Sequence, residues 1–432
     1  MSLHRIVIVG GGAGGLELAT LLGNKAGRKK RAHITLVDAN LTHVWKPRLH
    51  EVAAGVLNAD VDELNYVAHG KHHHFSFVMG RMSDLDRENK ELILSPHMEG
   101  TETILPERRV PYDTLVIAIG SQTNDFDTQG ASEHCIFLDR REAAEQFHRR
   151  FLYEYLKASQ DASAEPKHCN IAIVGAGATG VELAAELNHS AHELQRYGFD
   201  QIKPENLTVT IVEASNRVLP VLSETASAAI LRQLEQLNIK VLTNEMVTEI
   251  TPDGLHMKSG KFVPAYLKVW SAGVKAPDFM KELAGLETNR INQLVVKNTM
   301  QTTRDEHIFA FGDCAQCPRQ DADTPVPPRA QSAHQQALLL AKSLLNQLNC
   351  KPLLPFVYED KGSLISLSKG GSVGNIMGNL SKDFTFEGKI ARLMYVTLYR
   401  MHQHTLHGTL RTLLLILRDK INRRASPTLK LH

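Results

Sequence analysis

R-I-V-I-V-G-G-G-A-G-G at residues 5–15 and N-I-A-I-V-G-A-G-A-T-G at residues 170–180 are two copies of one pattern. Each copy begins as a short apolar strand, turns through Gly-x-Gly-x-x-Gly, and continues into a helix-like run, at 16–22 and 181–187. A single glycine-rich turn is a weak signal, because such turns are common. Two copies in the same strand–turn–helix context predict an α/β chain with two Rossmann-like dinucleotide-binding domains.

The glycines of each turn have separate roles. The first lets the chain turn sharply out of the strand, the second lets the backbone approach a pyrophosphate, and the third lets the helix pack closely on the strand. The pyrophosphate would lie at the helix N-terminus, where free N–H groups and the helix dipole favour an anion. The predicted contacts are Gly10, Gly12, Gly14 and Gly15 in the first turn, and Gly175, Gly177 and Gly180 in the second.

An acidic residue ends the second strand of each copy. The strand at 33–37 runs into Asp38, and the strand at 207–212 runs into Glu213. Such a carboxylate accepts hydrogen bonds from ribose hydroxyls and repels a 2′-phosphate, so the second site should prefer NADH to NADPH. Arg217 follows closely and would soften that preference. The alternative is two turns that merely pack tightly, and the presence of both acids opposes it.

The order of strands predicts that one domain is inserted into the other. An apolar run at 112–120 ends in glycine, and a second run at 302–313 ends in Gly-Asp. We assign the later strand to the first domain. The predicted domains are therefore 1–128 with 291–345 for the first, 129–290 for the inserted second, and 346–432 for a C-terminal region of strands and helices.

The C-terminal region differs in charge from the rest of the chain. The 432 residues carry 49 Lys and Arg against 47 Asp and Glu, a balance that argues against a whole-chain polyanion binder such as a nucleic-acid-binding protein. Residues 389–432, however, hold nine basic residues and one acid, Asp419. Two amphipathic helices are predicted here, at about 387–404 and 405–424. The apolar stripe consists of Leu406, Leu410, Leu413, Leu414, Leu417 and Ile421.

A basic amphipathic helix of this kind is typical of a membrane interface, so we expect residues 387–424 to bind an anionic lipid surface. The alternatives are a helix docked on the protein's own core and a contact in a homodimer. No signal peptide or transmembrane helix is predicted, because the apolar runs at 6–9 and 413–417 are too short. Five cysteines do not make a disulfide scaffold. No metal site is predicted, because Cys314 and Cys317 lack a second suitably spaced pair.

Four segments resemble the type II NADH:quinone oxidoreductases, the single-subunit NADH dehydrogenases that do not pump protons. They are W-K-P-R-L-H-E-V-A-A-G at 45–55, V-G-A-G-A-T-G-V-E-L at 174–183, A-Q-S-A-H-Q-Q-A at 330–337 and K-G-S-L at 361–364. The resemblance covers essentially the whole chain. It implies FAD at the first glycine site, NADH as co-substrate at the second, and a membrane quinone as electron acceptor.

The resemblance also implies roles for individual residues. Glu182 would lie beside the flavin and the nicotinamide. The alternative is that its negative charge only complements the positive end of the helix dipole. Gln331, His334 and Gln335 would contact the quinone, the two glutamines sharing one helix face at i and i+4. Lys361 is a candidate proton source for the quinol. The remaining implied contacts are Pro47, Gly120 and Asp313 for FAD, and Gly273 for NADH.

The expected reaction is hydride transfer from NADH to flavin N5, followed by two-electron reduction of quinone in a respiratory chain. The expected location is the cytoplasmic face of the inner membrane. A disulfide reductase of the same fold would need a cysteine pair early in the chain, and residues 1–134 contain none. A sulfide:quinone reductase remains an alternative through Cys169 and Cys350, although the intact second glycine motif opposes it. An NADH-binding membrane redox sensor is the other alternative.

Overall fold

The chain forms two compact units, and both are discontinuous. In the computed structural model, the described residues are 3–57, 63–160, 168–367, 372–376, 384–387, 389–425 and 429–430. The first unit comprises 1–45, 62–122 and 274–359, and the second comprises 46–61, 123–273 and 360–432. This division groups the short segment 46–61 with the second unit. The domain boundaries expected from the sequence remain a prediction.

A six-stranded sheet, in the order β23-β24-β11-β1-β2-β5, forms the centre of the first unit. Its five longer strands are parallel, and short β23 is antiparallel to β24. Residues Ile6 to Val9 of β1 are all buried, as expected for a strand covered on both faces. The strands are β1 (His4–Val9), β2 (Ala32–Asp38), β5 (Ser76–Met79), β11 (Thr114–Ile117), β23 (Gln301–Thr302) and β24 (Asp305–Ala310).

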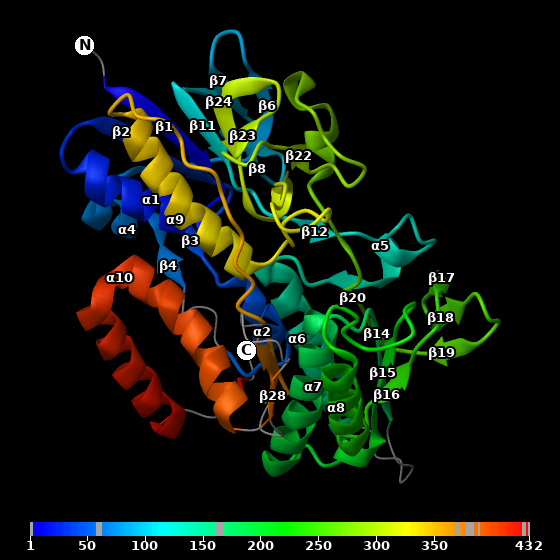
Figure 1. Cartoon of the computed structure of the whole chain (residues 1–432). Helices are drawn as coiled ribbons and strands as arrows, with labels where there is room; N and C mark the ends of the chain where they lie inside the picture. Colours follow the sequence, from blue (N-terminus) through cyan, green and yellow to red (C-terminus); the bar gives the residue numbers. More distant parts are fainter. Residues whose placement is uncertain are drawn as a thin grey trace. The chain divides into compact units, whose positions relative to one another are not determined.

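Helices and a small antiparallel sheet complete the first unit. Helix α1 (Ala13–Leu22) leads into a π-helical turn (Gly23–Gly27), and α1 packs along α9 (Ala330–Gln347), as Figure 1 shows. Helix α4 (Tyr66–His73) follows the short strand β4 (Leu64–Asn65), which pairs with β3 (Thr42–His43). The antiparallel sheet has the order β10-β7-β6 and consists of β6 (Met82–Asp86), β7 (Glu91–Leu94) and β10 (Arg108–Pro111).

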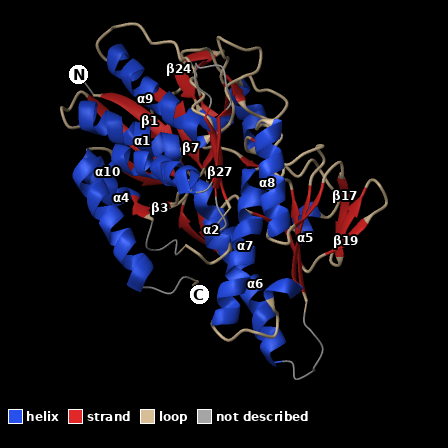
Figure 2. Ribbon diagram, turned by 60° about the horizontal axis from the view of Figure 1, so that its bottom comes forward, coloured by secondary structure: helices blue, strands red, loops and turns tan. Residues whose placement is uncertain are grey.

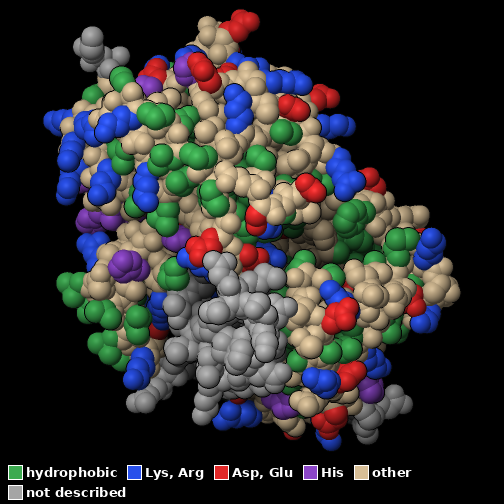
Figure 3. All heavy atoms as spheres, viewed as in Figure 1, with side chains coloured by type: hydrophobic (Ala, Val, Ile, Leu, Met, Phe, Trp, Pro, Cys, Tyr) green, Lys and Arg blue, Asp and Glu red, His purple; other side chains and the backbone are tan. Residues whose placement is uncertain are grey.

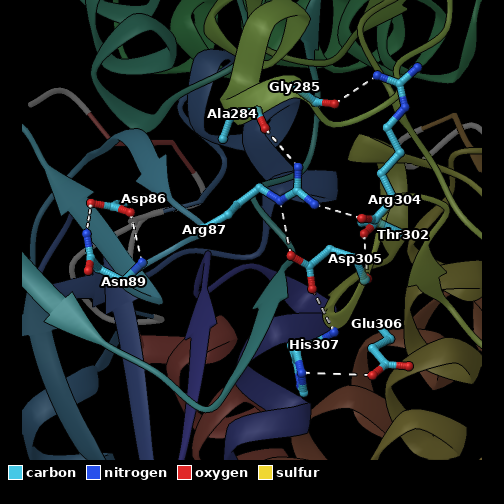
Figure 4. A network of polar contacts seen from close by, with 10 residues as sticks. All are labelled: Asp86, Arg87, Asn89, Ala284, Gly285, Thr302, Arg304, Asp305, Glu306 and His307. Carbon is cyan, nitrogen blue, oxygen red and sulfur yellow. Dashed lines mark hydrogen bonds and ion pairs between the residues drawn. The ribbon is translucent and has the colours of Figure 1, made fainter.

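Arg87 ties the antiparallel sheet of this unit to its parallel sheet. Its guanidinium donates to the Asp305 carboxylate (Nε–Oδ2, 3.0 Å) and to the carbonyl oxygens of Ala284 (3.1 Å) and Arg304 (2.7 Å), as drawn in Figure 4. Arg304 in turn donates to the carbonyl of Gly285 (2.9 Å). Because a guanidinium has five N–H donors in a fixed plane, one side chain can hold three segments in register.

The second unit has its own parallel sheet, in the order β13-β20-β14-β15-β16. Its strands are β13 (Ile136–Phe137), β14 (Cys169–Val174), β15 (Leu207–Val212), β16 (Lys240–Leu242) and β20 (Leu267–Trp270). Its helices include α6 (Arg141–Gln160), α7 (Ala178–Arg196) and α8 (Glu224–Gln236), and an antiparallel sheet follows with β17 (Val247–Thr251), β18 (Gly254–Met257) and β19 (Phe262–Pro264). Helix α2 (Leu49–Ala53) packs against both α6 and α7 (Figure 2).

The C-terminal part of the second unit consists of three antiparallel strands and a long broken helix. The strands are β26 (Ser363–Ser366), β27 (Ser372–Ile376) and β28 (Phe384–Glu387). Helix α10 (Lys389–Ala425) is interrupted at Gly408, which has φ +73° and ψ 176°. The break separates two arms, and Arg400 of the first arm donates to Asp419 of the second (2.7 Å). The two expected helices are thus confirmed, with their break at Gly408.

The end of the chain returns to the core of the second unit. Leu429 is buried, and its N–H donates to the Tyr197 hydroxyl (3.3 Å). The N–H of Lys430 donates to the carbonyl of Gly55 (2.8 Å), and the Lys430 carbonyl contacts Nε2 of His148 (2.9 Å). None of the helices among the described residues is long and apolar enough to cross a membrane.

The remaining elements are short. They are the 3-10 turns Lys46–Arg48, Pro204–Asn206, Asp278–Gly285 and Gly312–Cys314, the helix α5 (Ala131–His134), and the strands β8 (His97–Glu99), β9 (Glu102–Leu105), β12 (Gln122–Thr123), β21 (Val274–Lys275), β22 (Leu294–Val295) and β25 (Ala315–Gln316).

Candidate functional site

The first glycine turn lies between β1 and α1, and its glycines meet different surroundings. Gly10 has φ +102°, and a Cβ there would lie 2.4 Å from the carbonyl oxygen of Ala118. A Cβ on Gly15 would lie 1.9 Å from the carbonyl oxygen of Gly10. A Cβ on Gly12 would meet nothing within 4 Å. Packing of the protein itself therefore requires Gly10 and Gly15, whereas Gly12 keeps an open space at the helix N-terminus.

Asp38, at the end of β2, closes the first turn from the side. Its carboxylate accepts from the backbone N–H groups of Gly11 (2.6 Å) and Asn40 (2.8 Å). Burial raises the pKa of Asp38, and these backbone hydrogen bonds oppose that shift. The carbonyl of Gly11 contacts Nδ1 of His43 (2.9 Å) and accepts from the Tyr66 hydroxyl (2.7 Å). His43 and Tyr66 were missed from the sequence, because no local motif marks them.

The second glycine turn, between β14 and α7, repeats this geometry. Gly175 also has φ +102°, and its Cβ would lie 2.8 Å from the backbone nitrogen of Ala272. A Cβ on Gly180 would lie 2.1 Å from the carbonyl oxygen of Gly175, whereas one on Gly177 would meet nothing within 4 Å. The conformational demands predicted for the glycines are therefore found in both copies.

Glu213 takes the place of Asp38 in the second unit. Its Oε2 accepts from the N–H of Ala176 (2.7 Å), and its Oε1 accepts from the N–H of Ser215 (2.8 Å). Arg217 points elsewhere: its guanidinium donates to Glu224 (3.0 Å) and to the carbonyl oxygens of Pro220 (2.9 Å) and Leu222 (3.3 Å). These contacts hold Arg217 at the start of α8 and oppose the idea that it softens the preference for NADH.

Asp313 lies in a tightly held loop of the first unit. Its carboxylate accepts from the Ser121 hydroxyl (2.9 Å), and its carbonyl accepts from Gln293 (2.9 Å). The preceding Gly312 donates its N–H to Oε1 of Gln336 (2.9 Å), a buried residue that sequence reasoning missed. Gly120, also in the first unit, has φ +75° with open space at its Cβ position. The sequence-predicted strand ends therefore converge as expected within this unit.

Gly273, predicted as an NADH contact, lies in the second unit. It has φ +68°, and a Cβ there would lie 2.5 Å from the ring of Phe126. Pro47 also falls in the second unit, within the turn Lys46–Arg48. Lys361 is exposed just before β26. The roles predicted for Pro47 and Lys361 remain predictions.

The three residues predicted to contact a quinone lie at the start of α9. Gln331 accepts from the Tyr358 hydroxyl (3.0 Å). Gln335 donates to the carbonyl of Glu359 (2.8 Å) and accepts from its N–H (3.1 Å), so both glutamines reach the same segment and share one face. His334 lies closer to α1, with Nδ1 2.6 Å from the carboxylate of buried Glu17. A quinone would have to share or displace the contacts of both amides.

Glu182 lies in the second turn of α7, not in its first, and is buried. Its Oε1 accepts from the N–H of Ser366 (2.9 Å), and its Oε2 lies 3.5 Å from Nδ1 of His50, a buried residue of α2. Burial raises the pKa of Glu182 well above its ordinary value and lowers the pKa of His50 to about 4. A carboxyl group with raised proton affinity is suited to proton transfer. Sequence reasoning missed His50, although it falls in the quoted 45–55 segment.

The cysteines do not form a reactive pair in the described structure. Cys314 and Cys317 are both buried free thiols, and burial raises their pKa to about 12 and about 11. Cys169 is buried in β14, and burial raises its pKa to about 12. A buried thiol that resists ionisation is a poor nucleophile. Burial of both thiols therefore indicates that Cys314 and Cys317 serve packing. Among the described residues, no three His, Cys, Asp or Glu side chains are grouped to hold a metal ion.

Each of the two parallel sheets has a glycine turn and a second strand that ends in an acid, which is the arrangement of a dinucleotide-binding fold. The sequence accordingly matches the pyridine nucleotide-disulphide oxidoreductase family over residues 4–337. A solved structure of NDH2 from Plasmodium falciparum in complex with NADH has the same fold, with a TM-score of 0.84 over 99% of this chain and 100% of that one at 19% identity. A sulfide:quinone oxidoreductase from Aquifex aeolicus also shares it, with a TM-score of 0.73 at 17% identity over 94% and 92% of the two chains.

Curated relatives narrow the class. The type II NADH:quinone oxidoreductase of Haemophilus influenzae is 48% identical, and the alignment covers 100% of both chains. The enzyme of the same description from Mycobacterium tuberculosis is 27% identical over 92% of this chain and 83% of its own. The chain therefore belongs to the type II NADH:quinone oxidoreductases. The α/β fold with two dinucleotide-binding domains, the family and the enzyme class predicted from the sequence are confirmed.

Proposed function

We propose that the chain holds FAD at the Gly10–Asp38 site and NADH at the Gly175–Glu213 site, and uses them to reduce a membrane quinone without pumping protons. The observation that carries the proposal is the duplicated geometry. In each unit, an open space faces the second glycine, while the first and third glycines are packed against backbone. An open space beside a helix N-terminus fits a pyrophosphate, because a Cβ would fill that space and free N–H groups favour the anion.

FAD is the group that fits the first site, and bound there it would accept a hydride from NADH and pass two electrons to the quinone. The chain's part is to hold the reacting atoms together, at roughly 3–3.5 Å in productive complexes. Asp38 and Glu213 each retain acceptor capacity for ribose hydroxyls. A carboxylate has about four lone-pair sites, Glu213 accepts from two backbone N–H groups, and Asp38 accepts from two backbone N–H groups and the Asn40 side chain. Asp313, held by Ser121 and Gln293, would contact the flavin side chain.

One acid, Glu213, sets the preference for NADH in this proposal. Glu213 would accept from the adenosine ribose and repel a 2′-phosphate. Arg217 offers no compensation, since Glu224 and two carbonyl oxygens already hold its guanidinium.

The quinone contacts are proposed from the family resemblance. The position of both glutamines on one face of α9 supports them. Gln331 and Gln335 both reach residues 358–359, and His334 lies one turn away beside Glu17. Glu182 and Lys361 are the proposed groups for proton supply. Of these two, burial of Glu182 favours its protonated form.

Membrane attachment is proposed for the second arm of α10, residues 409–425. Four leucines and an isoleucine of the predicted stripe are more than half exposed: Leu410, Leu413, Leu414, Leu417 and Ile421. Figure 3 shows apolar side chains gathered over α10, with Lys and Arg side chains among them. Leu406, also predicted in the stripe, is buried, because the break at Gly408 leaves it on the first arm. The stripe therefore belongs to the second arm alone.

The charges of this arm suit an anionic surface. Asp419, the single acid of residues 389–432, is bound by Arg400 (2.7 Å) and Arg418 (2.8 Å). Exposed Arg411 and Lys420 stand beside the apolar stripe. We propose peripheral binding to an anionic leaflet on the cytoplasmic face, where each basic residue adds about 1 kcal/mol at most.

One assay tests the reaction. The purified protein should show a flavin absorbance spectrum, and it should oxidise NADH much faster when a short-chain quinone is added. A flavin spectrum without quinone-dependent NADH oxidation would contradict the proposal and would favour the sensor alternative. Sulfide-dependent quinone reduction exceeding that with NADH would favour the sulfide:quinone alternative.

A second assay tests attachment. Leu413→Gln combined with Leu417→Gln changes two side chains that are more than half exposed, so the fold should persist. The variant should no longer sediment with vesicles containing anionic lipid, while its turnover with a soluble quinone stays unchanged. Binding retained by the variant would refute the assignment. A change from dimer to monomer, with vesicle binding intact, would assign the face to a homodimer instead.

A further inference from the structure

A buried histidine faces the carboxyl group of Glu182 from a separate helix of the same unit. His50 lies on α2 and Glu182 on α7, and the side chains of both are almost completely buried, with 2% and 6% of their surface exposed. Nδ1 of His50 and Oε2 of Glu182 are 3.5 Å apart. The two residues are therefore neighbours without being locked by a short hydrogen bond.

The second ring nitrogen of His50 is the end of the ring that could take up a proton. Nε2 is buried and has no hydrogen-bond partner among the described residues. The ring of His50 also makes a hydrogen bond with the backbone of Pro47, which favours the charged form of the ring. A buried polar atom without a partner is costly, and a role in proton transfer is one reason for a protein to keep it.

The charges around the pair are few and nearly balanced. Arg48 and Glu51, on the same segment as His50, form a salt bridge with each other (2.6 Å). Glu186, one turn after Glu182 on α7, and Glu51 both favour protonation of Glu182, and the Ser366 N–H opposes it. For His50, Glu51 favours the charged ring and Arg48 opposes it. Burial outweighs these effects for both residues, so the pair prefers to be uncharged with one transferable proton on the carboxyl group.

We propose that His50 is a positioning residue that relays protons to Glu182, so that Glu182 can deliver the proton consumed in quinone reduction. This inference rests on the proposed function. The overall reaction converts NADH, quinone and one proton into NAD⁺ and quinol, and NADH supplies both electrons. The O–H bond of the Glu182 carboxyl breaks as an O–H bond of the quinol forms. His50 then gives its Nδ1 proton to the carboxylate while its Nε2 takes up a proton from water, which restores the carboxyl group.

Two half-reactions separate this role from a structural one. In rapid-mixing experiments, His50→Gln should leave the reduction of the flavin by NADH within about twofold, because that step consumes no extra proton. Reoxidation by quinone should slow by roughly 100-fold, the usual contribution of a general acid or base, and its pH dependence should change. His148→Gln is the matched control, since His148 is another buried histidine of the same unit and its Nε2 contacts the Lys430 carbonyl (2.9 Å). The control should leave both half-reactions unchanged.

Equal slowing of both half-reactions in His50→Gln, or no slowing of reoxidation, would overturn the proposal. Failure of the unaltered enzyme to oxidise NADH with quinone would instead overturn the proposed function. A measurement without substrates tests the His50–Glu182 pair independently of the proposed function. In ¹⁵N-histidine-labelled protein, one imidazole should stay neutral down to about pH 4, and its signals should shift in Glu182→Gln. A histidine that responds to Glu182→Gln but titrates near the ordinary value of 6.5 would refute the pair.

Discussion

The two glycine motifs place a buried glutamate at the same position, and the two glutamates meet different partners. Glu17 and Glu182 each stand two residues after the third glycine of their turn, and each faces Nδ1 of a histidine. In the first unit, Glu17 lies 2.6 Å from His334, whose side chain is 20% exposed. In the second unit, Glu182 lies 3.5 Å from a histidine that is 2% exposed.

This difference shows how one local motif can serve packing in one unit and chemistry in the other. A contact of 2.6 Å is as short as strong, charge-assisted hydrogen bonds, so Glu17 fastens α1 to α9. At a separation of 3.5 Å the two buried side chains interact weakly, so the Glu182 carboxyl group can hold or release a proton. The helix position is set by the repeated motif, and the function is set by what packs against it.

The largest expected effect is on stability, and it distinguishes the packed third glycine of each motif from the open second glycine. Gly15→Ala and Gly180→Ala place a Cβ about 2 Å from a backbone oxygen, so each should cost about 3 kcal/mol or more and disrupt its unit. Gly12→Ala and Gly177→Ala place a Cβ in open space and should leave the melting temperature within a few degrees. Instead, Gly12→Ala should lose flavin, and Gly177→Ala should raise the KM for NADH.

Calorimetry and flavin absorbance measure these outcomes. A stable Gly15→Ala variant that retains flavin would contradict the packing argument. A Gly12→Ala variant with normal flavin content would place the pyrophosphate elsewhere.

The next effect compares the two glutamates directly. Glu17→Gln weakens a short hydrogen bond at a buried carboxylate and should lower the free energy of unfolding by about 1–3 kcal/mol. Glu182→Gln replaces a carboxyl group that burial keeps protonated with an amide of the same shape, so its cost should be near zero in mildly acidic solution. Denaturant titrations of both variants give the comparison.

The pH dependence sharpens that comparison. The pKa of Glu182 is raised in the folded state, so its stabilising contribution is complete below the ordinary value of 4.5 and is lost as pH rises toward the folded pKa. The stability of Glu182→Gln relative to the unaltered protein should therefore increase as the solution becomes more alkaline. A difference that is constant from pH 5 to pH 9 would mean that Glu182 is not a buried neutral acid.

The sequence predicted the elements that local patterns encode. Repeated glycines, apolar strands and terminal acids identified both sheets, and the Gln331–Gln335 spacing identified a shared helix face. Partners that come from distant segments had no such signal. His50 and Glu182 are neighbours although they lie far apart in the sequence, and Tyr66 reaches the carbonyl of Gly11 from α4. One available signal was overlooked. The offset of 165 between the two motifs, applied to Glu182, leads directly to Glu17.

A smaller effect concerns the acids that end the second strands. Glu213→Gln should raise the KM for NADH about tenfold, because a charge-assisted hydrogen bond to a ribose hydroxyl is weakened, and it should narrow the preference over NADPH. Asp38→Asn is the counterpart in the first unit and should reduce flavin retention without changing that preference. Steady-state kinetics with both nucleotides measures the ratio. An unchanged ratio in Glu213→Gln would remove Glu213 from the nucleotide site.

The smallest effect is expected at Arg217. Its positive charge lies close to Glu213 in the sequence and suggests a second residue that distinguishes NADH from NADPH. Its guanidinium instead binds Glu224 and the carbonyl oxygens of Pro220 and Leu222, so a 2′-phosphate could reach it only by breaking those contacts. Arg217→Ala should therefore change the ratio of kcat/KM for NADH and NADPH by less than about twofold, and the exposed ion pair with Glu224 should contribute about 0.2–1 kcal/mol to stability. A severalfold stronger discrimination against NADPH in Arg217→Ala would mean that the arginine leaves Glu224 when the nucleotide binds. The preference for NADH would then depend on a balance between Glu213 and Arg217 rather than on Glu213 alone.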